Sequence, residues 1–111
     1  MAEPDSYEIS ALCYAVRTNR KHHENFIGSV WTDPMHDQDE PIAYYVWALK
    51  NANRTVVVDT GFDKAEWSRR TESSGGMWQC EYELSPADGL AGMGIDSRQV
   101  QDVIVTHLHY D

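Results

Sequence analysis

The last residues of the chain carry the side chains best suited to chemistry. His107, His109 and Asp111 follow one another in a His-x-His-x-Asp pattern. If the chain stays extended past Thr106, all three point to one side, because side chains in a strand alternate between its two faces. Imidazole nitrogens and a carboxylate oxygen suit a first-row divalent ion, and zinc is the usual one. The spacing predicts a metal site; the alternative is a polar cluster that faces solvent.

A rigid element must hold these ligands. The residues before them, Asp102–Val105, are apolar and β-branched after the first, which predicts a buried strand. A second run, Thr55–Val58, also predicts a strand and ends in Asp59-Thr60-Gly61. Glycine there allows a tight or left-handed backbone just past the strand.

Two further strands are expected upstream. Tyr7–Val16 alternates imperfectly but is rich in strand-forming residues, and Ile42–Leu49 is apolar on both faces. The second pattern predicts a strand that is covered on both sides. Lys50–Arg54 has the composition of a turn, so Ile42–Leu49 and Thr55–Val58 are expected to form a hairpin.

Capping signals predict two short helices. Asp63 followed by Glu66 has the spacing of a capping box, so a helix is expected through Arg70, broken by Thr71–Gly76. Ser85 and Pro86 mark a second start, since proline loses nothing at the first helical position. Gly94 is expected to close that helix.

The stretch Arg17–Pro41 is polar and without a sustained period, which predicts a long loop with a short element near Phe26-Ile27. It contains His22, His23 and His36. Adjacent histidines rarely ligate one metal together, so these three are interpreted as solvated side chains. Loops of this length are uncommon unless they shape a site, and whether this one borders the predicted metal site stays open.

Composition limits the function. The 111 residues fit one domain with a modest core, and 41% hydrophobic and 24% charged residues are typical of a soluble protein. A formal net charge of -9 disfavours nucleic acid and anionic membranes as partners. No run approaches a membrane span and the N-terminus is acidic, so a cytoplasmic protein is expected. Cys13 and Cys80 are interpreted as reduced thiols, one of them buried.

Taken together, Val56–Gly61 and Val103–Asp111 resemble the metallo-β-lactamase superfamily, whose hallmark is His-x-His-x-Asp-His after a buried strand. Ile42–Asp63 and Thr106–Asp111 are most similar to its N-acyl homoserine lactonase-like branch. The resemblance implies an α/β fold, the N-terminal part of an αββα sandwich with a mixed sheet, a hairpin and short helices. Residues 1–111 would then be one incomplete domain that ends inside the motif.

The resemblance also implies a function. A metal-bound hydroxide would open a lactone or related small-molecule ester, with two zinc ions expected per intact domain. His107 and His109 would bind the first metal, while Asp111 would bind the second and take a catalytic part by orienting the hydroxide. Asp59 would lie beside the site and hold a ligand histidine in its tautomer. The alternative for Asp59 is a plain turn carboxylate at a strand end.

A second hypothesis belongs to a different class. Two imidazoles and one carboxylate cannot fill two coordination spheres, and the family's next histidine would follow Asp111. The chain could therefore be truncated and catalytically inactive, with at most weak metal binding. Uncovered sheet edges would then make it marginally stable or self-associating. The sequence leaves the oligomeric state, the metal and the substrate open.

Overall fold

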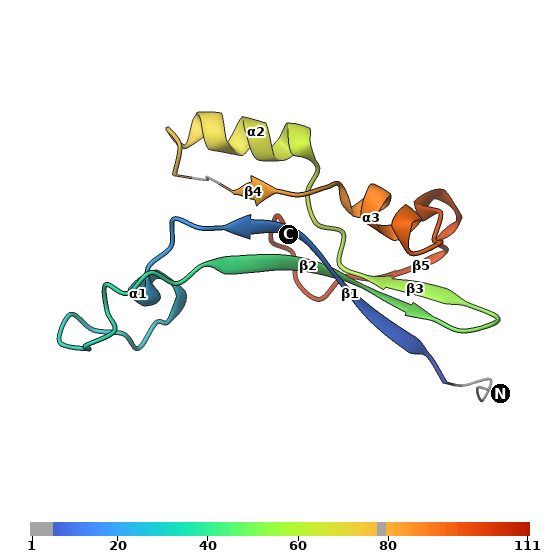
Figure 1. The fold of residues 1–111 in the computed structure, drawn as a ribbon, viewed down its shortest axis with the longest axis horizontal. Coiled ribbons are helices and arrows are strands. Elements are labelled where there is room, and N and C mark those ends of the chain that lie inside the picture. The colour runs from blue at the N-terminus through green and yellow to red at the C-terminus, as the bar shows by residue number, and fades with distance from the viewer. Residues whose placement is uncertain (1–5, 78–79) are drawn as a thin grey trace.

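The computed structural model describes residues 6–77 and 80–111, so the acidic residues 1–5 used to predict the compartment lie outside the described part. The chain forms one five-stranded sheet in the order β4-β1-β2-β3-β5, with short helices (Figure 1). The strands are β1 (Glu8–Arg17), β2 (Ile42–Lys50), β3 (Thr55–Val58), β4 (Glu81–Tyr82) and β5 (Asp102–Ile104). The sheet is mixed, because β3 and β5 run parallel while the other pairs are antiparallel. The predicted α/β class is confirmed.

The predicted hairpin is also confirmed. β2 and β3 pair antiparallel from Trp47 opposite Val58 to Lys50 opposite Thr55. Asn51 closes the turn, since its side-chain Oδ1 accepts the backbone N–H groups of Asn53 and Arg54 at 2.9 and 2.8 Å. β1 matches its predicted range within a residue at each end.

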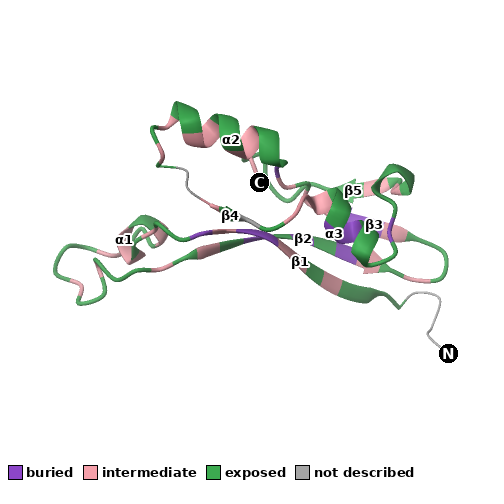
Figure 2. Cartoon of the chain, turned by 45° about the horizontal axis from the view of Figure 1, so that its top comes forward, coloured by how far each residue is buried: buried purple, intermediate pink, exposed green. Residues whose placement is uncertain are grey.

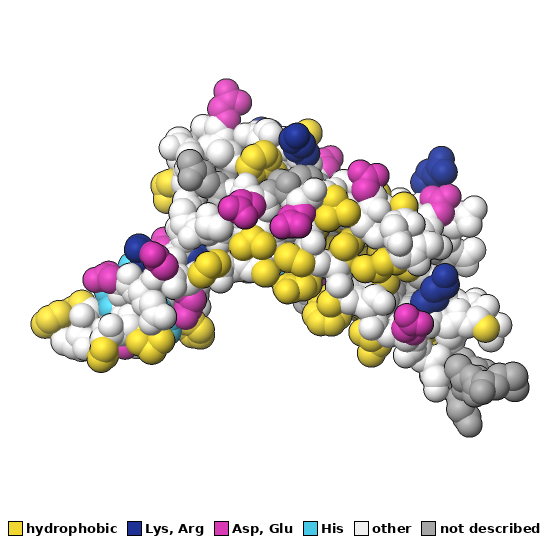
Figure 3. All heavy atoms as spheres, viewed as in Figure 1, with side chains coloured by type: hydrophobic (Ala, Val, Ile, Leu, Met, Phe, Trp, Pro, Cys, Tyr) yellow, Lys and Arg dark blue, Asp and Glu magenta, His cyan; other side chains and the backbone are white. Residues whose placement is uncertain are grey.

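The prediction that β2 is covered on both sides is wrong. Tyr44, Val46 and Ala48 are buried, whereas Tyr45 and Trp47 on the opposite face are 43% and 42% exposed. The helices α2 (Lys64–Ser73) and α3 (Pro86–Gly92) both pack on the first face (Figure 2). Figure 3 shows hydrophobic side chains gathered along the middle of the molecule. An apolar pattern alone could not tell which face the helices would cover.

Both predicted helix starts are confirmed. Asp63 Oδ1 accepts the Glu66 N–H at 2.8 Å, and Ser85 Oγ accepts the Asp88 N–H at 3.1 Å. The predicted break at Thr71 is wrong, because α2 continues to Ser73 and ends before Gly75 and Gly76, which both have positive φ. Gly94 (φ 79°) follows the end of α3, as predicted.

The prediction of a buried final strand is wrong as well. A 3₁₀ turn, η1 (Ser97–Gln99), leads into β5, which lies at the edge of the sheet beyond β3. Val103 and Ile104 are 48% and 52% exposed. The edge position explains this exposure, because the strand has a neighbour in the sheet on one side only.

The long loop (residues 18–41) extends from one end of β1 and β2 and contains the short helix α1 (His22–Asn25) (Figure 1). It gives the molecule an elongated outline of 53 × 30 × 22 Å. The prediction of a long loop is confirmed, with its short element just before Phe26. Within the described residues, every helix is too short or too polar to cross a membrane.

Candidate metal centre

The sheet brings Asp59 next to Thr106. Because parallel strands end at the same edge of a sheet, the residues that follow β3 and β5 lie side by side. The Thr106 backbone N–H donates to Asp59 Oδ1 at 2.9 Å, and its hydroxyl lies 2.9 and 2.7 Å from the two carboxylate oxygens. Asp59 adopts a left-handed backbone (φ 64°), uncommon outside glycine and frequent at functional sites.

These contacts favour the ionised form of Asp59 and set the direction of the Thr106 hydroxyl hydrogen bond. The Thr106 N–H, the Thr106 hydroxyl and the neighbouring His107 together lower the pKa of Asp59, with the backbone N–H as the largest cause. An ionised carboxylate only accepts hydrogen bonds, so the Thr106 hydroxyl proton points to Asp59. The Thr106 oxygen is then left to accept from His107 Nδ1, which lies 3.0 Å away.

His107 therefore donates from Nδ1 to Thr106, and its Nε2 faces Asp111. Nε2 lies 3.2 Å from Asp111 Oδ1. A neutral imidazole nitrogen and an ionised carboxylate oxygen are both acceptors, so a cation or a second proton must lie between them at this distance. The donor set and this geometry fit a divalent metal, with Asp59 and Thr106 holding the histidine in the required tautomer.

His109 is less well placed. Its ring lies edge-on to that of His107, with 5.0 Å between the centroids. The chain bends at Leu108 and His109, so the expectation that it stays extended and points all three side chains one way is wrong. The main-chain oxygen of Asp111 accepts the Gly61 N–H at 3.2 Å, which turns the segment back toward β3. We call His107, His109 and Asp111 the C-terminal centre.

Tyr110 anchors this segment to the core. Its ring packs against Tyr44 and Phe62, and its hydroxyl lies 2.9 Å from the Tyr44 hydroxyl. The guanidinium carbon of Arg70 lies 5.1 Å from the ring centroid. Burial, with a smaller effect of Tyr44, raises the pKa of Tyr110 well above its ordinary value. Tyr110 is thus a neutral anchor between two candidate ligands.

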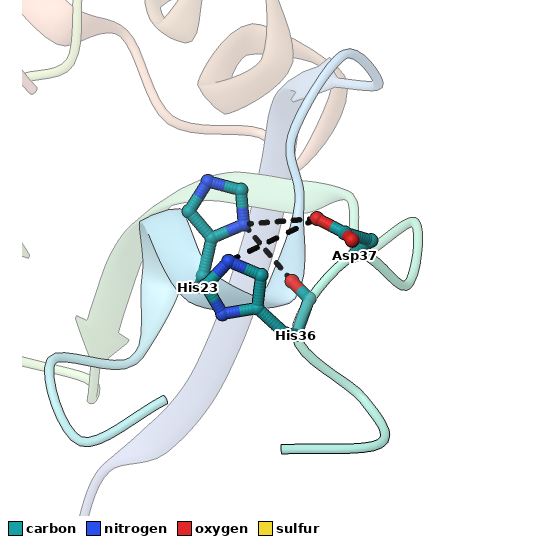
Figure 4. Close-up of side chains that lie close together, drawn as sticks. All are labelled: His23, His36 and Asp37. Carbon is teal, nitrogen blue, oxygen red and sulfur yellow. Dashed lines mark hydrogen bonds and ion pairs between the residues drawn. The ribbon is translucent and has the colours of Figure 1, made fainter. Parts of the chain in front are cut away.

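A second cluster lies in the long loop, where the interpretation as solvated side chains is wrong for His22 and His36 but not for His23, whose side chain is 36% exposed. The side chains of His22 and His36 are only 14% and 23% exposed, rather than solvated. In the part of the chain that the structure describes, one group of three ligand-type side chains has its donor atoms within 4.8 Å of one another: His23, His36 and Asp37 (Figure 4). We call this group the loop site. Its histidines are 13 positions apart in the sequence, and no periodic pattern would pair them.

Among the described residues, neither cysteine belongs to a group of metal-ligand side chains. Cys13 and Cys80 are both free and partly buried. Burial raises the pKa of the Cys80 thiol, which makes it a poor nucleophile at neutral pH.

Comparison with known proteins gives one family. Searches of curated proteins and of solved structures found no match. The family model of the metallo-beta-lactamase superfamily matches residues 39–111, which include β3, β5, the residues Asp59 and Thr106 that follow them, and all of the C-terminal centre. Superfamily members are in general metal-dependent hydrolases, and the match covers well over half of the sequence. This chain belongs to the metallo-beta-lactamase superfamily.

Proposed function

We propose that the C-terminal centre binds zinc in a hydrolase that opens a lactone or a related small-molecule ester. The observation that carries the proposal is the contact between His107 Nε2 and Asp111 Oδ1 at 3.2 Å, with the other imidazole nitrogen already held by Thr106. Superfamily membership supports hydrolase activity and metal binding in general. The choice of a lactone rests on the likeness of residues 42–63 and 106–111 to the lactonase-like branch.

The residues of this chain would orient the metal ligands and the attacking water. Asp59 accepts from Thr106, and Thr106 accepts from His107 Nδ1, so Nε2 is the ring nitrogen left for a metal. His109 and Asp111 would complete the donor set contributed by this chain. When bound, zinc supplies Lewis-acid chemistry, which lowers the pKa of water toward neutrality and polarises an ester carbonyl. Asp111 would also accept a hydrogen bond from the attacking water and orient it.

The substrate would bind at an exposed surface around the C-terminal centre. His107 is 38% exposed in its side chain, and His109 is exposed. A small cavity of about 200 Å³ lies near Asp59 and is lined mainly by apolar side chains from β2, β3 and α3. An ester with a short apolar group fits this surface better than a phosphodiester, because the chain is strongly acidic.

The test is hydrolysis by the zinc-loaded chain of a matched panel: a simple lactone, a thioester, a β-lactam and a phosphodiester. We expect lactone opening that is lost on chelation and in His109→Ala. The loop variant His36→Ala is the matched control and should keep the activity. Hydrolysis of another panel member in place of the lactone would refute the substrate class while leaving the hydrolase assignment.

A second candidate is a metal-binding chain without hydrolase activity. The placement of His109 favours it, because its ring turns edge-on to His107 and the three donor atoms do not gather within 4.8 Å in the described structure. This candidate predicts zinc uptake that depends on His107 with no turnover of any panel member. Zinc analysis and the hydrolysis panel, run on the same sample, separate the two candidates.

A further inference from the structure

The loop site lies apart from the sheet edge that carries the C-terminal centre, at the far end of β1 and β2 (Figure 1). His23 Nδ1 and His36 Nε2 each lie 3.9 Å from Asp37 Oδ1. Two donor atoms bound at about 2.1 Å to one ion are at most about 4.2 Å apart, so these separations already fit a shared ion. Small side-chain movements would bring the three donors into a coordination sphere.

The backbone holds both histidines in place. Three hydrogen bonds of 2.8 to 3.1 Å join the two legs of the loop: His22 N–H to the Gln38 carbonyl, His23 N–H to the His36 carbonyl, and Glu40 N–H to the Arg20 carbonyl. An ion pair between Lys21 and Asp39 adds a fourth connection. Ligands from two chain segments are therefore already gathered without an ion, which reduces the entropy lost on binding.

The imidazole rings are also arranged relative to each other. The rings of His23 and His36 stack with 4.3 Å between centroids and 13° between planes. His23 Nδ1 lies 2.9 Å from the His36 carbonyl oxygen, to which it donates a proton in the free chain. A bound cation would replace that proton and would have the carbonyl oxygen as a neighbouring donor. His36 Nδ1 is buried and has no hydrogen-bond partner among the described residues.

The surroundings favour a cation. Residues 18–41 contain five acidic and two basic side chains. Both basic side chains are engaged with partners inside the loop: Lys21 with Asp39, and Arg20 with Asn25 and Glu24. Two nitrogens and one carboxylate oxygen suit a first-row divalent ion of the zinc, nickel or copper class, with solvent completing the sphere.

We propose that His23, His36 and Asp37 form a second divalent-metal site that joins the two legs of the long loop. The site is separate from the C-terminal centre in sequence, in position and in its supporting elements. Its role is to fix the loop rather than to activate a substrate, because its two histidines come from opposite legs of the loop, which backbone hydrogen bonds join. The proposal stands whether or not the chain is a hydrolase.

The experiment isolates the loop site by using a chain with His107→Gln and His109→Gln. Zinc chloride is titrated by calorimetry, and the imidazole nitrogens are followed by two-dimensional ¹H–¹⁵N NMR. We expect this chain to bind one zinc ion and the His23 and His36 signals to shift. Adding His23→Gln should weaken zinc binding by at least about tenfold. Even the replacement of a residue that only hydrogen-bonds to a metal ligand lowers metal affinity by about 10–100-fold.

A second pair of variants guards against misfolding. The Asp37 side chain is 88% exposed, so Asp37→Asn should leave the fold intact and still weaken zinc binding. Asp39→Asn removes the same charge from the same loop but not from the ligand group, and it should bind zinc nearly as before. The proposal is overturned if the His107→Gln, His109→Gln chain binds no zinc, or if its zinc binding is unchanged by His23→Gln and Asp37→Asn.

Discussion

The C-terminal centre and the loop site contain the same three kinds of ligand, two imidazoles and one carboxylate, but their supports differ. The C-terminal centre follows β5 at the edge of the sheet. There Asp59 and Thr106 orient His107, and Tyr110 anchors the C-terminal segment to the core. The loop site is held by backbone hydrogen bonds between two legs of a loop outside the hydrophobic core. The sheet edge therefore orients one histidine through side-chain contacts, while the loop brings two histidines and a carboxylate together through backbone hydrogen bonds.

The largest difference between the two regions should appear in stability. Gly61 has φ of 65°, and a Cβ atom there would lie 2.8 Å from Tyr14 Cζ. Gly61→Ala should destabilise the fold by about 2–4 kcal/mol through backbone strain and overpacking. Gly28→Ala in the long loop is the matched control, because nothing lies within 4 Å of its added Cβ. Denaturant unfolding measures both, and equal effects would contradict the comparison.

The next effect concerns metal affinity. Asp59→Ala removes the acceptor that orients Thr106, so zinc binding at the C-terminal centre should weaken by about 10–100-fold while the loop site is unaffected. Calorimetry in a His23→Gln chain isolates this change. Asp96→Ala is the control, since that carboxylate also accepts a backbone N–H, from Arg98, but contacts neither site. An unchanged affinity in Asp59→Ala would mean that Asp59 is only a turn residue.

Tyr110→Phe should have a smaller effect. It removes the hydroxyl that lies 2.9 Å from the Tyr44 hydroxyl and leaves the ring contacts in place. The expected loss is about 1 kcal/mol of unfolding free energy, the usual value for one hydrogen bond. Tyr45→Phe, on the exposed face of β2, should change little. A similar loss in both variants would argue against a special anchor at Tyr110.

The smallest effect is a pH dependence in α2, the helix that contacts Tyr110 through Arg70. Hydrogen bonds from Arg69 and Arg70 lower the pKa of Glu66 from 4.5 to about 2. The folded-state pKa is depressed, so this stabilisation is fully present above pH 4.5 and is lost as the pH falls toward about 2. Thermal unfolding between pH 6 and pH 2.5 should show that loss, and Glu66→Gln should reduce the slope. An identical slope in the variant would refute the assignment.

The sequence predicted the positions of strands and helices better than the burial of their side chains. The ranges of β1, β2, β3 and β5, the hairpin and both helix caps follow from local patterns, because alternation and capping act over a few residues. The two-residue strand β4 was not predicted. Burial was predicted wrongly for Trp47 and for Ile104, because it depends on which face the helices cover and on which strand ends the sheet. Those are long-range outcomes that apolar patterns do not encode.

The two sites show the same limit. His107 and Asp111 were predicted from spacing, yet the route from Asp59 through Thr106 to His107 was not. A signal for it was present: a parallel pair would place the ends of Thr55–Val58 and Asp102–Val105 at one edge. The loop site gave no such signal, because hydrogen bonds between distant legs bring His23 to His36. Adjacent His22 turns instead toward Glu40, with Nδ1 3.1 Å from that carboxylate.

The most direct test of the C-terminal centre is a zinc titration of the unaltered chain followed by ¹H–¹⁵N NMR of the imidazole nitrogens. We expect the Nε2 signals of His107 and His109 to shift with bound zinc, while Nδ1 of His107 keeps its proton to Thr106 and His22 does not respond. Unchanged His107 and His109 signals in a folded, zinc-saturated chain would contradict the assignment of a metal centre to this end of the sheet.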